Sequence, residues 1–329
     1  MKTLQQIVSS KEFIQRGRQG RGAILLRKLL STLAATATDD DSVFAVLDKD
    51  APLPSRMEPM LAPLSVASDV ANNSTLRTTS AMKLATHHLF TNKKLFSRAN
   101  KSRVNLFCVS QACVTFPVRE LHEKLEQARE TIQTTTTSSS LSIVPVVSEM
   151  WIQSLGTTSI TFGHSLSLHD QMLAKITRIF VRQNVNTGKL LTVSDQERSG
   201  LFPPLLEPNN NNGLPVVLRP NEPPLFEHME HVFEARVGPQ HVNEHRLVDP
   251  SALADIALQG LALRGYQHET HNVSCHYLVP AQLNQTLSVR IHSHLPLVGL
   301  YNHQERPSGT GQQLMCLVLV TPKQDGNEL

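Results

Sequence analysis

The sequence predicts an α+β protein made of two similar units, each a curved antiparallel sheet wrapped on one central helix. In each half of the chain a strand-like segment comes first, then a helix-like segment, then several more strand-like segments. The chain has 329 residues, which suits two domains of about 100–150 residues each. Apolar residues make up 40% of it, enough to form a core.

The N-terminal segment, residues 1–38, carries seven basic side chains and one acid, Glu12. Apolar residues recur at helical intervals over residues 23–30. A basic, acid-poor, amphipathic start is typical of a mitochondrial presequence, so we expect a location in the mitochondrial matrix. The alternatives are an ordinary basic surface helix, or an extension that contacts ribosomal RNA phosphates. The net charge of +3 is by itself too small to indicate nucleic-acid binding.

Residues 39–100 are expected to form an extended linker or arm. Four prolines between residues 52 and 63 exclude a long helix there. A short helix is predicted over residues 81–97, where basic side chains gather. Together with residues 1–38, this stretch would give the protein an extended N-terminal arm.

The first unit is expected over residues 101–206. A segment rich in β-branched and aromatic residues predicts its first strand, and a helical apolar spacing predicts its helix. The expected elements are a strand at 104–118, a helix at 119–132, and strands at 141–154, 157–168 and 172–184.

The second unit, expected over residues 222–323, repeats this order. Asp249-Pro250 predicts a helix start, because Asp can accept from free backbone amides and Pro suits the first helical turn. Gly265 stands where a C-terminal cap is expected. The expected elements are a strand at 225–237, a helix at 251–263, and strands at 271–279, 285–295, 297–305 and 312–321.

Several short motifs point to one superfamily. Residues 237–245, Val-Gly-Pro-Gln-His-Val-Asn-Glu-His, resemble the His-Val-Asn signature of 4-hydroxybenzoyl-CoA-type and acyl-ACP thioesterases. Tyr277-Leu-Val-Pro280 followed by Leu287-Ser-Val289 is similar to a strand pair of that family. In the first half, residues 151–162 and 174–198 resemble its strand-turn-strand and its C-terminal tail.

This resemblance covers residues 104–205 and 225–322, and it implies a double hotdog fold. It also implies that His241 acts as a base or oxyanion donor with Asn243 orienting it. Glu244 would be a substitute base, while Asp249 is expected to serve as the helix cap. The alternative is that His241 and Asn243 only stabilise the loop, since both residue types favour turns.

The sequence departs from the family pattern where the family carries its polar groups. Asp is usual four residues before the His and frequent two residues earlier, but this chain has Val237 and Ala235 there. Acyl-ACP thioesterases carry an Asn two residues before the His, where this chain has Pro239. Thioester hydrolysis needs a base or nucleophile beside the carbonyl, so the pattern predicts a degenerate centre.

No other constellation predicts a catalytic or metal site. Acids or histidines near the two helices are expected to be solvated: Glu120, His122, Glu123, Glu126, Glu130 and Asp255. The four cysteines lack CxxC spacing. His87 and His88 are adjacent in sequence, and the His241/His245 pair has the i, i+4 spacing of helical zinc ligands but precedes the predicted helix. Residues 17–22 space their glycines incorrectly for a dinucleotide loop. We therefore expect no metal and no cofactor.

These observations predict a thioesterase-like, non-catalytic structural subunit of a large mitochondrial assembly, such as the mitochondrial ribosome or a respiratory complex. Its partners would be the other protein subunits. The alternative is a mitochondrial acyl-CoA or acyl-ACP thioesterase that hydrolyses a fatty acyl thioester with His241, Asn243 and Glu244. No apolar run reaches the roughly 18 residues of a membrane-spanning helix.

Overall fold

The structure, a computed structural model, describes most of the chain between residues 56 and 322. The described ranges are 56–71, 75–91, 104–124, 143–184, 189–195, 198, 228–242, 248–266, 271–279, 281–306 and 309–322. The predicted presequence, residues 1–38, therefore lies outside the described residues, as does the start of the predicted arm.

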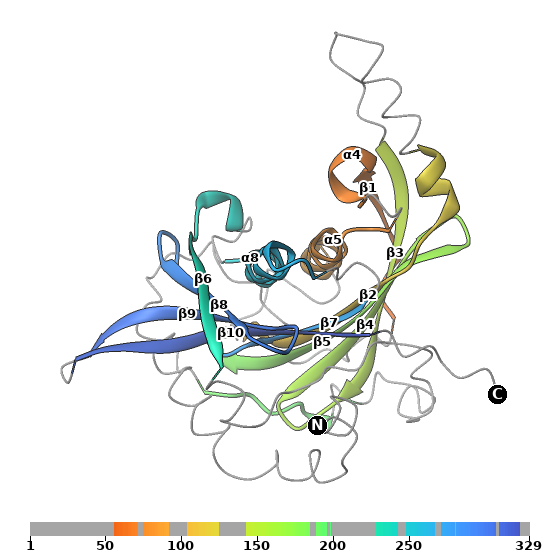
Figure 1. Cartoon of the computed structure of the whole chain (residues 1–329). Coiled ribbons are helices and arrows are strands. Elements are labelled where there is room, and N and C mark those ends of the chain that lie inside the picture. Colours follow the sequence, from red (N-terminus) through yellow and green to blue (C-terminus); the bar gives the residue numbers. More distant parts are fainter. Residues whose placement is uncertain are drawn as a thin grey trace.

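Ten strands form one curved antiparallel sheet (Figure 1). Their order in space is β1-β3-β4-β5-β2-β7-β10-β9-β8-β6. In chain order they are β1 (Met60–Ser65), β2 (Val104–Thr115), β3 (Ile143–Leu155), β4 (Ser159–Leu168), β5 (Gln171–Asn184), β6 (Met229–Arg236), β7 (His271–Tyr277), β8 (Thr286–His292), β9 (Leu297–Arg306) and β10 (Gly309–Pro322).

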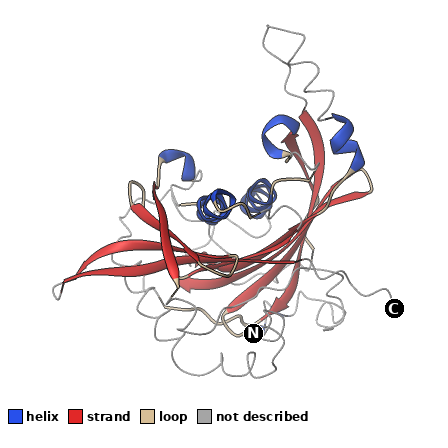
Figure 2. Ribbon diagram, viewed as in Figure 1, coloured by secondary structure: helices blue, strands red, loops and turns tan. Residues whose placement is uncertain are grey.

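The sheet consists of two halves with the same topology. The order β1-β3-β4-β5-β2 in the first half is repeated, reversed in space, as β7-β10-β9-β8-β6 in the second. The halves join through β2 and β7, where Gln111 lies opposite Cys275. Each half sends one helix onto the concave face: α5 (Thr78–Thr91) and α8 (Pro250–Leu263). The two helices lie side by side and touch (Figure 2).

Helix α8 begins and ends as its sequence predicts. The Asp249 carboxylate accepts a hydrogen bond of 2.8 Å from the Ser251 amide, and Pro250 occupies the first helical position. Gly265 follows the helix with a φ of +79°, a conformation that costs glycine little. Small and aliphatic residues line the buried face of α8, so the helix lies close to the sheet.

The first half starts earlier in the chain than the sequence suggested. Residues 56–91, assigned to an extended linker with a short helix at 81–97, hold β1, the short helix α4 (Val66–Asp69) and α5. The predicted short helix overlaps α5 over residues 81–91. Pro63 is compatible with β1 because β1 is an edge strand, bonded only to β3. The central helix of this half is therefore α5. Of the helix predicted at 119–132 the structure describes residues 119–124, which are helical and follow β2. The predicted strand at 104–118 is the second strand of its half.

The remaining strand predictions agree with β3 to β10, apart from a few residues at their ends. The main hydrophobic core lies between the sheet and the two helices, and it is continuous across both halves. A large antiparallel sheet with few helices is consistent with a hotdog fold. Among the described residues, no helix is long and apolar enough to cross a membrane.

Candidate functional site

His241 lies on the connection between β6 and α8, where the sequence signature places it. It ends a short 3-10 helix, η3 (Pro239–His241). The backbone holds this turn firmly: the His241 amide donates to the Gly238 carbonyl at 3.0 Å, and the Asp249 amide donates to the His241 carbonyl at 2.9 Å. The ring is half-buried. The connection thus fixes His241 near the N-terminus of α8.

The hydrogen bonding of the ring sets what His241 can do. The Gly238 amide donates to Nδ1 at 3.0 Å. A nitrogen that accepts a hydrogen bond carries no proton, so in this arrangement the ring hydrogen lies on Nε2. Nε2 can then donate to an oxyanion, whereas Nδ1 is engaged and no free lone pair remains to abstract a proton. Among the described residues, the Gly238 amide is the one hydrogen-bond partner of the ring.

The acids that could assist His241 are absent or engaged in the described part of the connection. Val237 is fully buried in the core, and its backbone bonds to Gln285 and Asn284. The Asp249 carboxylate accepts from both the amide and the hydroxyl of Ser251, at 2.8 and 2.7 Å. It therefore serves as the helix cap, as the sequence predicted. Asn243 and Glu244 lie outside the described residues, so their predicted roles stay predictions.

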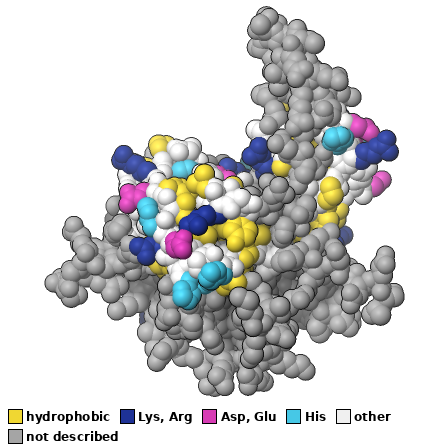
Figure 3. All heavy atoms as spheres, in the orientation of Figure 1, with side chains coloured by type: hydrophobic (Ala, Val, Ile, Leu, Met, Phe, Trp, Pro, Cys, Tyr) yellow, Lys and Arg dark blue, Asp and Glu magenta, His cyan; other side chains and the backbone are white. Residues whose placement is uncertain are grey.

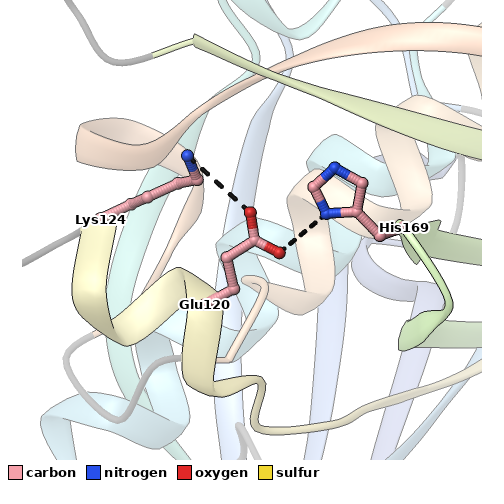
Figure 4. A network of polar contacts seen from close by, with 3 residues as sticks. All are labelled: Glu120, Lys124 and His169. Atoms are coloured by element: carbon pink, nitrogen blue, oxygen red, sulfur yellow. Dashed lines mark hydrogen bonds and ion pairs between the residues drawn. The ribbon is translucent and has the colours of Figure 1, made fainter.

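Of the polar residues predicted near the first-half helix, Glu120, His122 and Glu123 lie at the surface, whereas Glu126 and Glu130 lie outside the described residues. Glu120 forms an ion pair with Lys124 at 3.8 Å and bonds to Nδ1 of His169 at 2.9 Å (Figure 4). His169 occupies the β4–β5 turn with a φ of +50°. Glu123 pairs with Arg119, and Asp255 accepts from Gln259 on the outer side of α8. Exposed pairs of this kind contribute little to stability.

The histidine and cysteine side chains do not form a metal site in the described ranges. No group of three or more His, Cys, Asp or Glu side chains there is arranged to hold a metal ion. The ring of His88 is bonded to the Ser148 hydroxyl at 2.8 Å and to the Glu58 carbonyl at 2.9 Å, whereas its neighbour His87 is exposed. His88 therefore has a structural role in holding α5 on the sheet.

All four cysteines are free and buried. Burial raises the pKa of Cys108 and that of Cys275 to about 12, and it also raises the pKa values of Cys113 and Cys316. A thiol reacts as its thiolate, so these side chains are protonated and unreactive at neutral pH.

A buried polar cluster that no sequence motif indicated lies beneath α5. Arg178 on β5 donates from Nε to the Gln111 side-chain oxygen at 3.1 Å and from Nη2 to the Met82 carbonyl at 3.0 Å. Gln111 also bonds to the Tyr277 hydroxyl of the other half. The available signal was the two-residue period of a strand, because Arg178 lies two residues from both Ile176 and Phe180 and so shares their core-facing side.

No family model matches the sequence, and no curated protein does. Among the solved structures to which the chain is similar are thioesterases and a MaoC-like dehydratase. The 12:0-ACP thioesterase from Umbellularia californica matches 80% of this chain and 94% of its own length, with a TM-score of 0.49 and 11% identity. An acyl-ACP thioesterase from Bacteroides thetaiotaomicron matches 80% and 96%, with a TM-score of 0.48 and 11% identity. A MaoC-like dehydratase from Phytophthora capsici matches 84% and 99%, with a TM-score of 0.42 and 9% identity.

Proposed function

We propose that this chain is a double hotdog protein without a working hydrolytic centre, and that it serves as a structural subunit of a large mitochondrial assembly. The observation that carries the proposal is the state of the His241 ring. Its Nδ1 is occupied by the Gly238 amide, which leaves a donor and not a base at the signature position. A general base must have a free lone pair directed at the proton that it removes.

The outer face of β1 and β3 supports a role as a subunit. Leu61 is 71% exposed and Ile143 is 64% exposed, on neighbouring strands at the edge of the sheet. Between them Pro63 lies opposite Pro145, and both prolines are exposed. An exposed apolar surface shared by two adjacent strands marks a site of protein contact more often than a single exposed side chain does.

Charge on the visible surface also fits a protein partner. On the face shown in Figure 3, basic and acidic side chains of the described residues are interspersed, with hydrophobic ones between them. Nucleic-acid-binding surfaces instead gather basic side chains on one face. The mitochondrial location and the assembly itself rest on the basic residues 1–38 and on the lost acids at positions 235 and 237.

A hydrolysis assay tests the catalytic part of the proposal. The purified full-length chain would be incubated with acetyl-, octanoyl- and palmitoyl-CoA, and free CoA would be measured. We expect release no faster than without protein, and the same rate for His241→Ala. His231→Ala, which changes an exposed histidine on β6, is the matched control. Turnover that His241→Ala abolishes and His231→Ala preserves would contradict the proposal.

A sedimentation experiment tests the assembly part. The tagged wild-type chain should migrate in the heavy fractions of a mitochondrial extract. Leu61→Ser combined with Ile143→Ser should move it to light fractions without lowering its Tm. Leu263→Ser, which changes a leucine that is 69% exposed on α8, should not. If the wild type sediments only as a small free species, the assembly role is wrong.

A further inference from the structure

Arg178 is a cation enclosed in the interior of the first half. Its side chain is 1% exposed and lies between the sheet and α5. The guanidinium reaches Gln111 on β2 and both Met82 and Thr86 on α5. These three contacts use Nε and Nη2 and hold the side chain in one position. Every one of these acceptors is electrically neutral.

The positive charge of Arg178 has no counterion in the part of the chain that the structure describes. No carboxylate forms an ion pair with it there, and its Nη1 has no hydrogen-bond partner. A buried ion is strongly unfavourable unless it is paired and all its donors are satisfied. Because Nε and Nη2 are already engaged, Nη1 alone offers free hydrogen atoms.

A second buried donor lies beside Arg178. His164 on β4 pairs with Ile176, two residues from Arg178 on β5, so the two side chains are diagonal neighbours on one sheet face. His164 is fully buried, and neither of its ring nitrogens has a hydrogen-bond partner. Burial first, and then the charge of Arg178 and nearby His88, lower the pKa of His164 well below its usual range. The neutral ring still carries one N–H.

We infer that a small monovalent anion of chloride size binds beneath α5, accepting hydrogen bonds from Nη1 of Arg178 and from the ring N–H of His164. Such an ion neutralises the guanidinium and satisfies both unpaired donors. A single free nitrogen on Arg178 suits a compact anion better than the two-point contact typical of larger carboxylates. The fully buried neighbours Phe162 and Met82 also favour a small occupant.

The first test measures stability in different salts. Thermal unfolding of the full-length wild type would be recorded in sodium chloride and in sodium gluconate at equal ionic strength. We expect the Tm to be about 5 °C higher in saturating chloride, with a saturable concentration dependence. Arg178→Met should remove the difference, and Arg290→Met, which changes an arginine over the Tyr301 ring on the other half, should keep it.

The second test does not depend on the variant folding. Crystals of the wild type grown in sodium bromide would be measured at the bromine absorption edge. An anomalous peak within hydrogen-bond distance of Nη1 of Arg178 supports the site. The inference is overturned if no such peak is present, if the wild-type Tm is the same in both salts, or if a folded Arg178→Met variant keeps the chloride effect.

Discussion

The two halves of the sheet share their topology and differ in what they enclose. In the first half, β5 presents Arg178 to α5, opposite Gln111 of β2. In the second, β10 presents Val318 to the core, opposite Cys275 of β7. The interior beneath α5 therefore contains a buried polar cluster, whereas the corresponding position in the second half is apolar. The sequence signature belongs to the apolar half, whereas the unsatisfied charge belongs to the polar half.

This difference shows that topology does not decide where chemistry is located. The strand order places a residue beneath each helix, but the side chain at that position decides whether the layer packs or binds. In the second half, His241 stands outside the core on a connection held by the backbone. In the first half, residues far apart in the chain meet around Arg178.

The largest loss of stability is expected from placing an arginine at the corresponding position of the second half. Val318→Arg would bury a charge in the hydrophobic core, so we expect the free energy of unfolding to fall by about 3–5 kcal/mol. Urea denaturation of the full chain measures this change. Val318→Ile, which only adds bulk, should cost about 1–3 kcal/mol. A stable Val318→Arg variant would show that the second half also has room for polar groups.

A second comparison uses two glycines on corresponding strands. A Cβ on Gly163 of β4 would lie 2.6 Å from the Trp151 ring, and one on Gly299 of β9 would lie 2.6 Å from the Tyr301 ring. Gly163→Ala should destabilise the protein by about 1–3 kcal/mol, because it must displace the larger indole. Gly299→Ala should cost less, since the tip of a tyrosine ring moves more easily. Equal losses in thermal unfolding would contradict this ranking.

The loss of stability in acid should depend more on a buried histidine of the first half than on one of the second half. Burial lowers the pKa of His164 well below its usual range, and burial together with His228 and His294 lowers that of His292 in the second half. A histidine whose folded pKa is lowered stabilises the protein above its unfolded value of about 6.5, and this stability is lost as the pH falls below it.

The free energy of unfolding, measured from pH 7 to pH 5, should therefore decrease. His164→Leu should flatten this dependence more than His292→Leu, because the ring of His164 has the larger shift. His88, whose pKa burial also lowers, and Arg178 remain in both variants. If the two variants show the same slope, the polar interior of the first half does not control acid stability.

The smallest effect concerns the acids that precede the two helices. Asp249→Ala should destabilise the protein by about 1 kcal/mol, because α8 loses its N-terminal cap. Asp69 has a different role, since it accepts from the Ser65 amide and the Ser80 hydroxyl and so ties α4 to α5. Asp69→Asn keeps an acceptor and should cost less than Asp249→Ala in urea denaturation. A larger loss of stability for Asp69→Asn than for Asp249→Ala would contradict this ranking.

The elements of the second half were predicted correctly because residues close in sequence mark where its helix begins and ends. Asp249-Pro250 starts α8, Gly265 ends it, and alternating apolar residues mark the strands that follow. In the first half the signals were weaker. Pro63 argued against a strand, although it lies in the edge strand β1. Helix α5 has Thr, Ser and His among its apolar residues, so its helical apolar spacing is weak. The central helix of the first half was therefore predicted at 119–132, where the sequence after β2 is amphipathic.

The sequence alone determined the alternating strands, the cap of α8 and the loss of acids around His241, because these depend on residue type and near neighbours. Only the tertiary structure decided which nitrogen of His241 is free, since that depends on the turn of η3. It also decided which nitrogens of Arg178 are hydrogen-bonded, because their acceptors, Gln111, Met82 and Thr86, come from other elements. A buried charge is judged by what surrounds it, and those surroundings form only when the sheet and α5 come together.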